Sequence, residues 1–347
     1  MGRYVIYGAG AIGGVVGARL HESGHEVGLI ARGPHLEAIR RDGLTLVTPT
    51  ERITQRIPAA ADAAQLGLGS RPGDVVLLAV KSQDTVGALL AIRATGADVP
   101  IVCLQNGVEN ERAAARLFAD VYGAVVLAPT EHLEPGEVRA AGAQASGIID
   151  VGRYPTGVDE RCEQICAALT ASRIHSTATP DVMRGKYAKL LRNLGNAVGA
   201  LFGDPEERRD ELIEQLRAEG RAALDAAGID HRDDVVDDIG GRWSLLGVER
   251  NGDRGGSSTW QSLARGTGTI ETDYLNGEVV LLGRLHGVAT PLNAAICRVA
   301  AAAARRGDPP ESLSIDESLA TVGAAGRLTA EPVVARAGGS DSERVQP

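Results

Sequence analysis

The chain has 347 residues, of which 23% are charged and 44% are hydrophobic, as in an ordinary globular protein. This length suffices for about two domains. The net charge is −9 and no basic block is present, so we expect no nucleic-acid partner. No apolar run approaches the ~20 residues that span a bilayer, and no leader precedes the first predicted strand. We therefore expect a cytoplasmic protein without a membrane partner.

The first part of the chain alternates short apolar strands with helical segments. We predict strands at 3–8, 26–31, 74–80, 100–104 and 121–127, with helices between them at 11–23, 35–42, 84–95 and 109–118. This alternation is typical of a parallel sheet covered by helices on both faces, which is a doubly wound, Rossmann-type α/β fold. An extended stretch at 137–151 and a helix at 158–170 complete this part.

After residue 177 the pattern becomes helical. We predict helices at 179–202, 206–228, 271–287 and 291–306, broken at Pro205, Gly228, Gly287 and Pro291. The sequence thus predicts an α/β domain over 1–177 and an all-helical domain over 178–307. Residues 308–347 have little periodicity and a polar end, so we expect a poorly ordered tail.

Lysine is scarce in this chain. Of its 36 basic residues 33 are arginines, and the lysines are Lys81, Lys186 and Lys189. A surface position accepts either cation, whereas an ammonium group is a compact donor whose pKa moves readily on burial. The three lysines are therefore candidates for positions that need an amine.

A glycine-rich loop connects the first strand to the first helix. Its sequence is Gly8-Ala9-Gly10-Ala11-Ile12-Gly13, which fits the GxGxxG pattern in the strand-to-helix position that a dinucleotide site requires. Glycines there allow a tight turn and bring a pyrophosphate to the helix N-terminus, where free N–H groups favour an anion. We predict that this loop binds a nicotinamide dinucleotide.

The end of the second strand indicates which dinucleotide. An NAD site usually carries an acidic residue there to bind the ribose hydroxyls. Here the strand runs into Ala31-Arg32-Gly33, and a guanidinium such as that of Arg32 can pair with a 2′-phosphate. We therefore predict NADP(H) as the cofactor.

Polar residues follow the later strands at the sheet edge where α/β proteins bind ligands. Lys81 comes directly after the strand at 74–80, and Asn106 follows the strand at 100–104. We predict that they line one crevice. No Cys or His group has metal-ligand spacing, so we expect no metal.

The helix predicted at 179–202 carries four polar residues on one face, because the spacings between them are 3, 4 and 3. They are Lys186, Lys189, Asn193 and Asn196. A polar stripe beside apolar surface is costly to bury unless a ligand or partner satisfies it. Farther along, Ser257-Ser258 precede a predicted short helix and Glu271 opens the helix predicted at 271–287, so capping and helix-dipole roles compete with a role in binding or catalysis.

Over residues 3–306 the chain resembles the ketopantoate reductase (2-dehydropantoate 2-reductase) family. The matching stretches are the Gly8–Gly14 loop, Ile30-Ala31-Arg32-Gly33, Val80-Lys81, Gln105-Asn106-Gly107, Lys186-Tyr187-Ala188-Lys189-Leu190-Leu191, Asn193, Ser257-Ser258, 270–277 and 286–291. The resemblance implies a Rossmann domain followed by a helical domain of the 6-phosphogluconate-dehydrogenase type. It also implies NADPH-dependent reduction of a 2-keto acid, 2-dehydropantoate, to pantoate in pantothenate and coenzyme A biosynthesis, and it raises a homodimer as an expectation.

The resemblance also assigns roles to residues. It implies that Lys189 is the catalytic lysine and Glu271 its partner carboxylate. Substrate-binding positions fall on Asn193 and Ser258, and Asn196 stands one residue short of a further one. Lys81 and Asn106 match positions where cofactor and substrate meet, Asn106 serving both.

Two features depart from the family pattern on the substrate side. The stretch 127–152 is longer than usual, and one extra residue lies between Ser258 and Glu271. Two alternatives therefore stay open. The first is an NADPH-dependent reductase of a different keto acid, ketone or imine on the same fold, and the second is a non-catalytic NADPH-binding module.

Overall fold

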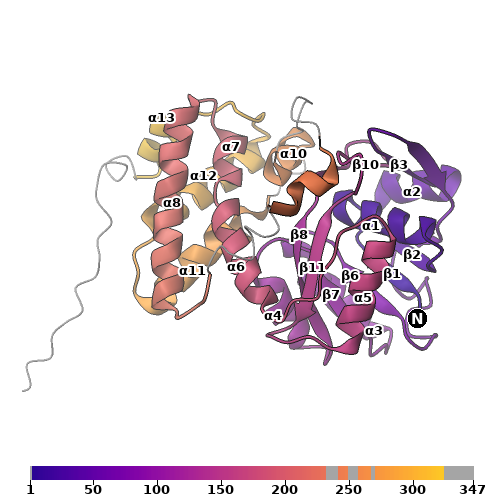
Figure 1. The fold of residues 1–347 in the computed structure, drawn as a ribbon. Helices are drawn as coiled ribbons and strands as arrows, with labels where there is room; N and C mark the ends of the chain where they lie inside the picture. Colours follow the sequence, from indigo (N-terminus) through magenta and orange to yellow (C-terminus); the bar gives the residue numbers. More distant parts are fainter. Residues whose placement is uncertain (1, 232–240, 249–256, 267–269, 324–347) are drawn as a thin grey trace, which may run out of the picture.

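A computed structural model describes residues 2–231, 241–248, 257–266 and 270–323 of the chain. It has a half built around β-sheet and a half built of helices (Figure 1). This arrangement confirms the predicted fold class, an α/β half followed by an all-helical half.

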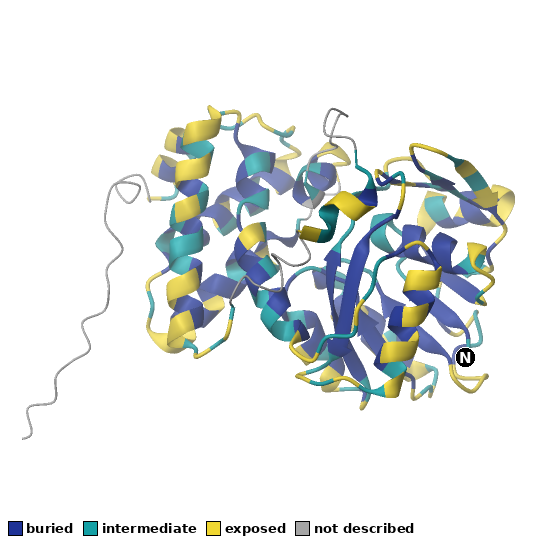
Figure 2. Ribbon diagram, in the orientation of Figure 1, coloured by how far each residue is buried: buried dark blue, intermediate teal, exposed yellow. Residues whose placement is uncertain are grey.

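A seven-stranded sheet forms the centre of the first half, in the order β11-β8-β7-β6-β1-β2-β5. All neighbours are parallel except β11, which runs antiparallel to β8. The strands are β1 (Tyr4–Tyr7), β2 (Val27–Ile30), β5 (Ala59–Ala60), β6 (Val75–Leu78), β7 (Ile101–Cys103), β8 (Val121–Leu127) and β11 (Ile148–Arg153). Their near-continuous apolar sequences fit a sheet buried on both faces, and the strands are dark blue in Figure 2.

Helices connect the strands of this sheet and cover its faces (Figure 1). They are α1 (Ala11–Glu22), α2 (Gly33–Asp42), the short 3₁₀ helix η1 (Ser82–Asp84), α3 (Thr85–Ala94), α4 (Glu109–Ala115) and α5 (Glu160–Ala171). Each parallel βα unit ends its strand at the same edge of the sheet, so the loops after β1, β2, β6 and β7 meet there.

A second sheet of four strands was not predicted from the sequence. Its order is β4-β3-β10-β9, where β3 is Leu44–Val47, β4 Arg52–Gln55, β9 Thr130–Glu131 and β10 Glu137–Ala140. The parallel β3–β10 pair joins segments some ninety residues apart, with Leu46 opposite Val138. Strands this short give a weak periodic signal, and pairing at that distance along the chain leaves no local pattern.

The second half packs its helices around a separate apolar core. They are α6 (Val182–Asn193), α7 (Asn196–Leu201), α8 (Glu206–Ala226), η2 (Arg242–Leu246), α10 (Ser258–Ala264), η3 (Glu271–Tyr274), α11 (Asn276–His286), α12 (Pro291–Arg306) and α13 (Ile315–Thr321). Buried Leu216 of α8, Val279 of α11 and Ile296 of α12 belong to this core. Helix α6 also packs against β8 and therefore joins the two halves.

The helix predicted at 179–202 is broken in two. Helix α6 ends at Asn193 and α7 begins at Asn196. A Cβ at Gly195 would lie 3.0 Å from Ile213 Cδ1, so a glycine here allows α8 to pack closely. Glycine also has a low helix propensity. The prediction that four polar residues share one helix face is therefore wrong for Asn196. The helix predicted at 271–287 likewise divides into η3 and α11 at Leu275.

The prediction of a poorly ordered tail is wrong for residues 308–323. Leu313 N–H donates to Leu201 O at 3.0 Å, and α13 follows. Ile315 and Leu319 are fully buried in the helical core, because their spacing of four places both on one face of α13. Residues 324–347 lie outside the described part. The boundary at 177/178 falls in the connection between α5 and α6 and stays a prediction.

Candidate active site

A cavity of about 900 Å³ lies between the edge of the large sheet, the small sheet and the helical half. Its walls combine the glycine-rich loop with residues that follow the strands and residues of the helical half. The polar or charged side chains among them are Arg32, Lys81, Asp84, Gln105, Asn106, Thr130, Glu131, Lys189, Asn193, Ser257, Gln261, Arg265 and Glu271. Segments that are distant in sequence thus meet in one place, with both polar and apolar walls.

The glycine-rich loop has the geometry of a dinucleotide cradle. Gly8 has φ +106°, which favours glycine, and a Cβ at Gly13 would lie 2.1 Å from Gly8 O. A Cβ at Gly10 would meet only open space, and Gly10, Ala11 and Ile12 line the cavity. No side chain caps the N-terminus of α1 at Gly10. The first-turn N–H groups can therefore receive a pyrophosphate, and the loop fits the predicted cofactor.

Arg32 stands at the start of α2, at the cofactor end of the cavity. Its side chain is 73% exposed and its Nη2 lies 3.4 Å from Asp84 Oδ2 of η1. Such an exposed ion pair is weak, so the guanidinium is available to an anionic group. Asp84 was not predicted to lie here, because it follows β6 whereas Arg32 follows β2.

Lys81 and Glu271 pair with each other across the two halves of the molecule. Lys81 Nζ lies 2.6 Å from Glu271 Oε2, and Ser82 N–H donates to Glu271 Oε1 at 2.9 Å. The Ser82 hydroxyl donates to the same oxygen at 3.2 Å. Glu271 is therefore held mainly by the segment after β6, and its negative charge favours the protonated form of Lys189.

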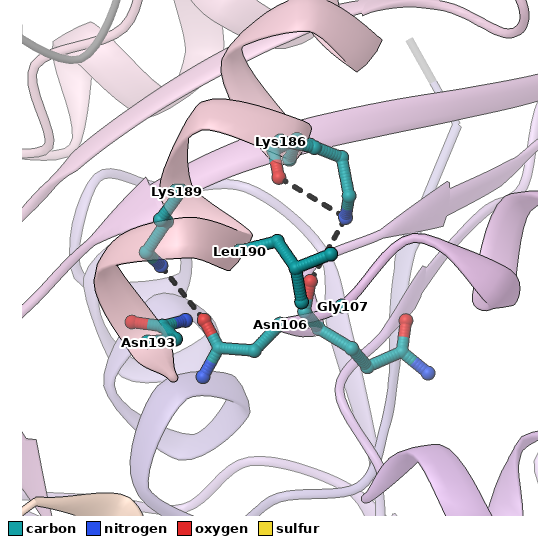
Figure 3. Close-up of a pocket in the computed structure, with 8 residues that line it drawn as sticks. Asn106, Gly107, Lys186, Lys189, Leu190 and Asn193 are labelled. Carbon is teal, nitrogen blue, oxygen red and sulfur yellow. Dashed lines mark hydrogen bonds between the residues drawn. The ribbon is translucent and has the colours of Figure 1, made fainter. Parts of the chain in front are cut away.

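Lys189 projects from α6 into the cavity and is partly buried. Its Nζ donates to Asn106 Oδ1 at 2.7 Å (Figure 3) and also to Val126 O. The pKa of Lys189 is lowered to about 7: burial has the largest effect, the positive charge of Lys186 also lowers the pKa, and the negative charge of Glu271 opposes both. An amine that titrates near neutral pH can donate a proton and take it back under physiological conditions.

A hydrogen-bond network holds the Asn106 loop behind Lys189. Asn110 Nδ2 donates to Asn106 O at 2.9 Å and to Ser82 Oγ at 3.3 Å. Thr85 Oγ1 in turn donates to Asn110 Oδ1 at 2.7 Å. Sequence reasoning missed these supporting residues, although Ser82 directly follows Lys81 and Asn110 stands one helical turn after Asn106.

The remaining residues predicted to bind substrate differ in whether they line the cavity. Asn193 lines the cavity beside Lys189 (Figure 3). Asn196 is not among the lining residues, and its backbone oxygen accepts from Ser257 Oγ at 3.2 Å. Ser257 caps α10 by accepting from Trp260 N–H at 3.3 Å and also lines the cavity. Ser258 begins α10, but its side chain lies outside the described residues.

The comparisons with known proteins agree with this architecture. The sequence profile described as "Ketopantoate reductase PanE/ApbA" matches residues 4–156, and that described as "Ketopantoate reductase PanE/ApbA C terminal" matches residues 181–304. A 2-dehydropantoate 2-reductase of Halobacterium salinarum is 32% identical over 307 residues, covering 84% of this chain and 95% of that protein. The chain belongs to the ketopantoate reductase family.

Further relatives match this chain over nearly all of their own length. The 2-dehydropantoate 2-reductase of Mesorhizobium japonicum is 30% identical, and the match covers 88% of the present chain and 99% of that relative. The crystal structure of a PanE/ApbA family ketopantoate reductase from Ralstonia eutropha JMP134 has a TM-score of 0.73 at 30% identity, with coverage of 88% and 99%. A D-mandelate dehydrogenase solved with NADH and anilino(oxo)acetate shares the fold, at a TM-score of 0.73 and 20% identity.

Family membership confirms that the protein is an NADP-dependent oxidoreductase and that NADPH/NADP is its cofactor. In the described part of this reductase no group of three or more His, Cys, Asp or Glu residues is placed to hold a metal ion. Within the same residues no helix has both the length and the apolar character to cross a membrane. The predicted cytoplasmic location and homodimer stay predictions.

Proposed function

We propose that this reductase converts 2-dehydropantoate to pantoate with NADPH, with Lys189 as the general acid. The observation that carries the proposal is the placement of the Lys189 ammonium in the same cavity as the glycine-rich loop. Relatives that match over at least 93% of their own length are named 2-dehydropantoate 2-reductases. The alternative of a non-catalytic NADPH-binding module has no comparable support.

NADPH, when bound, supplies the hydride that adds to the carbonyl carbon. The loop at Gly8–Gly13 and the N-terminus of α1 would hold the pyrophosphate, and Arg32 would pair with the 2′-phosphate. These residues fix the cofactor at the end of the cavity that adjoins Lys81 and Asn106.

Lys189 polarises the substrate carbonyl and protonates its oxygen. An ammonium has three donors, and in the described residues two of those of Lys189 are used, by Asn106 Oδ1 and Val126 O. The third is available to the carbonyl oxygen, so the two protein acceptors orient it. As negative charge develops on that oxygen, the ammonium stabilises it and then transfers a proton from Nζ.

Glu271 and Asn193 position the reactants. The carboxylate of Glu271 favours the protonated form of Lys189 and holds Lys81 at the edge of the cavity. Asn193, one helical turn after Lys189, offers a neutral amide that binds the substrate without changing the charge of the site. Ser258 is proposed as a further substrate contact on the family resemblance alone, and the same holds for Asn196, which does not line the cavity.

The reaction should slow at alkaline pH. The pKa of Lys189 is lowered to about 7, so its ammonium is present below that pH and is lost above it. We expect kcat/KM at saturating NADPH to fall along a basic limb with an apparent pKa at least two units below the ordinary lysine value of about 10.4. A profile that stays flat to pH 10 would contradict Lys189 as a perturbed general acid.

Arg32 should determine the preference for NADPH over NADH. Hydrogen bonds to a charged group contribute about 1.5–3 kcal/mol, so Arg32→Ala should lower kcat/KM for NADPH about 10–150-fold and leave NADH turnover nearly unchanged. Arg40→Ala is the matched control, because Arg40 is an exposed arginine of the same helix that does not line the cavity. Equal losses with both cofactors in Arg32→Ala would contradict this role.

The substrate assignment is tested by kcat/KM for 2-dehydropantoate beside a panel of branched and aromatic 2-keto acids, all with NADPH. We expect 2-dehydropantoate to give the highest value. A higher value for another keto acid would contradict 2-dehydropantoate as the substrate and favour the alternative, a reductase of a different carbonyl compound. The proposed role of Lys189 would be unaffected.

A further inference from the structure

Lys186 and Lys189 make parallel contacts one turn apart on α6. Lys186 Nζ donates to Gln105 O at 2.9 Å and to Ala124 O at 3.4 Å, while Lys189 Nζ donates to Asn106 Oδ1 and Val126 O. Each ammonium therefore joins one residue of the loop after β7 to one carbonyl of β8. Figure 3 shows the two lysines and the bond from Lys189 to Asn106.

The two lysines differ in their counter-ion. Lys186 Nζ lies 2.6 Å from Glu111 Oε1, and the two side chains are 3% and 0% exposed. Lys189 has no carboxylate at ion-pair distance within the described residues; Glu271 acts on it from farther away. Lys186 is thus ion-paired and enclosed, whereas Lys189 lines the cavity with no carboxylate at ion-pair distance among the described residues.

We propose that the buried Lys186–Glu111 pair is a positioning device for Lys189: it anchors α6 to the loop that carries Asn106 and fixes a positive charge behind the Lys189 amine. The geometry carries this inference, because Gln105 and Asn106 are adjacent and each is bound by one of the two lysines. The inference rests on the proposed role of Lys189 as the proton donor.

A fixed charge at Lys186 has a defined effect on its neighbour. The nearby ammonium disfavours a second positive charge, and this lowers the pKa of Lys189 in addition to the larger effect of burial. The Glu271 carboxylate acts in the opposite direction. The other charged groups on the walls of the cavity are Arg32, Lys81, Asp84, Glu131 and Arg265, together with Glu111 behind Lys186.

A purely structural ion pair would behave differently. Replacing both members of a buried pair by neutral groups of similar size is often neutral for stability, whereas removing one partner leaves an unpaired charge. A structural role therefore changes the free energy of unfolding and leaves the titration of Lys189 where it was. The positioning role moves that titration.

The chain offers a direct measurement because it has only three lysines. Competitive labelling of the amines with trace acetic anhydride across pH, read by peptide mass spectrometry, gives the pKa of Lys189 without substrate or turnover. Two variants remove the charge of Lys186 by different routes. They are the double variant Lys186→Met with Glu111→Gln, and Lys186→Gln, in which the buried Glu111 carboxyl can take up a proton because burial raises its pKa.

We expect the pKa of Lys189 to rise by about one unit or more in each folded variant. The control Glu109→Gln should leave it unchanged, since Glu109 is a half-buried carboxylate of α4 that pairs with Arg112. An unchanged value in either folded charge-removing variant would overturn the proposal. A pKa of Lys189 near the ordinary lysine value in the wild-type protein would also overturn the proposal, and this measurement requires no variant. Failure to reduce 2-dehydropantoate would overturn only the proposed function, because labelling requires no substrate.

Discussion

Replacing Lys189 with arginine should lower kcat for carbonyl reduction about 10²–10⁴-fold, the usual contribution of a general acid. Arginine keeps the positive charge, but its guanidinium holds its protons far more tightly than an amine that titrates near neutral pH. Because the planar guanidinium is also larger, it cannot reproduce the contacts of Nζ with Asn106 Oδ1 and Val126 O. The measurement is steady-state turnover at saturating NADPH.

Binding of NADPH is the control for this variant. In the described residues the hydrogen bonds of Lys189 Nζ go to Asn106 and Val126 rather than to the cofactor loop at Gly8–Gly13, so the Kd for NADPH should stay close to the wild-type value in Lys189→Arg. Turnover within tenfold of wild type would show that a positive charge alone is sufficient and that the proton of Lys189 is not needed.

Two glycines of the cofactor loop should differ in how the same added methyl group affects stability, although both substitutions should weaken NADPH binding. In Gly13→Ala the new Cβ would lie 2.1 Å from Gly8 O and 2.9 Å from Ala79 Cβ. The backbone must move, so we expect a loss of about 1–3 kcal/mol or more in the free energy of unfolding, together with impaired NADPH binding. Thermal unfolding and fluorescence titration with NADPH measure the two effects.

Gly10→Ala is the matched variant. Its Cβ has no neighbour within 4 Å, and the residue faces the cavity at the start of α1. Stability should change by less than about 1 kcal/mol. Binding of NADPH should weaken about 10–150-fold, the range for losing a hydrogen bond to a charged group, because the methyl group occupies space that the pyrophosphate needs. Unchanged NADPH affinity in Gly10→Ala would contradict the proposal that this loop binds the pyrophosphate.

Features that are local in the sequence were predictable. The strand–glycine loop–helix unit at 4–22 depends on neighbours in the chain, and the βα order places Lys81 and Asn106 at the same edge of the sheet. The spacing of four between Lys189 and Asn193 puts both on one face of α6, and both line the cavity.

Contacts between distant segments were not predictable. Glu111 reads as one more polar residue of a short helix, yet it is fully buried against Lys186, 75 positions away. The pairing of Glu271 with Lys81 spans 190 residues, and Gly195, at the break between α6 and α7, packs closely against Ile213 of another helix. In each case tertiary packing determines the outcome, and periodicity does not report it.

The most direct test of the central claim is the loss of NADPH absorbance when 2-dehydropantoate is added to the wild-type protein and to Lys189→Arg. The account predicts one NADPH oxidised for each pantoate formed, much slower oxidation of NADH, and a loss of at least about 100-fold in the variant. Tight NADPH binding without oxidation in the presence of 2-dehydropantoate or any other 2-keto acid of the panel would contradict it.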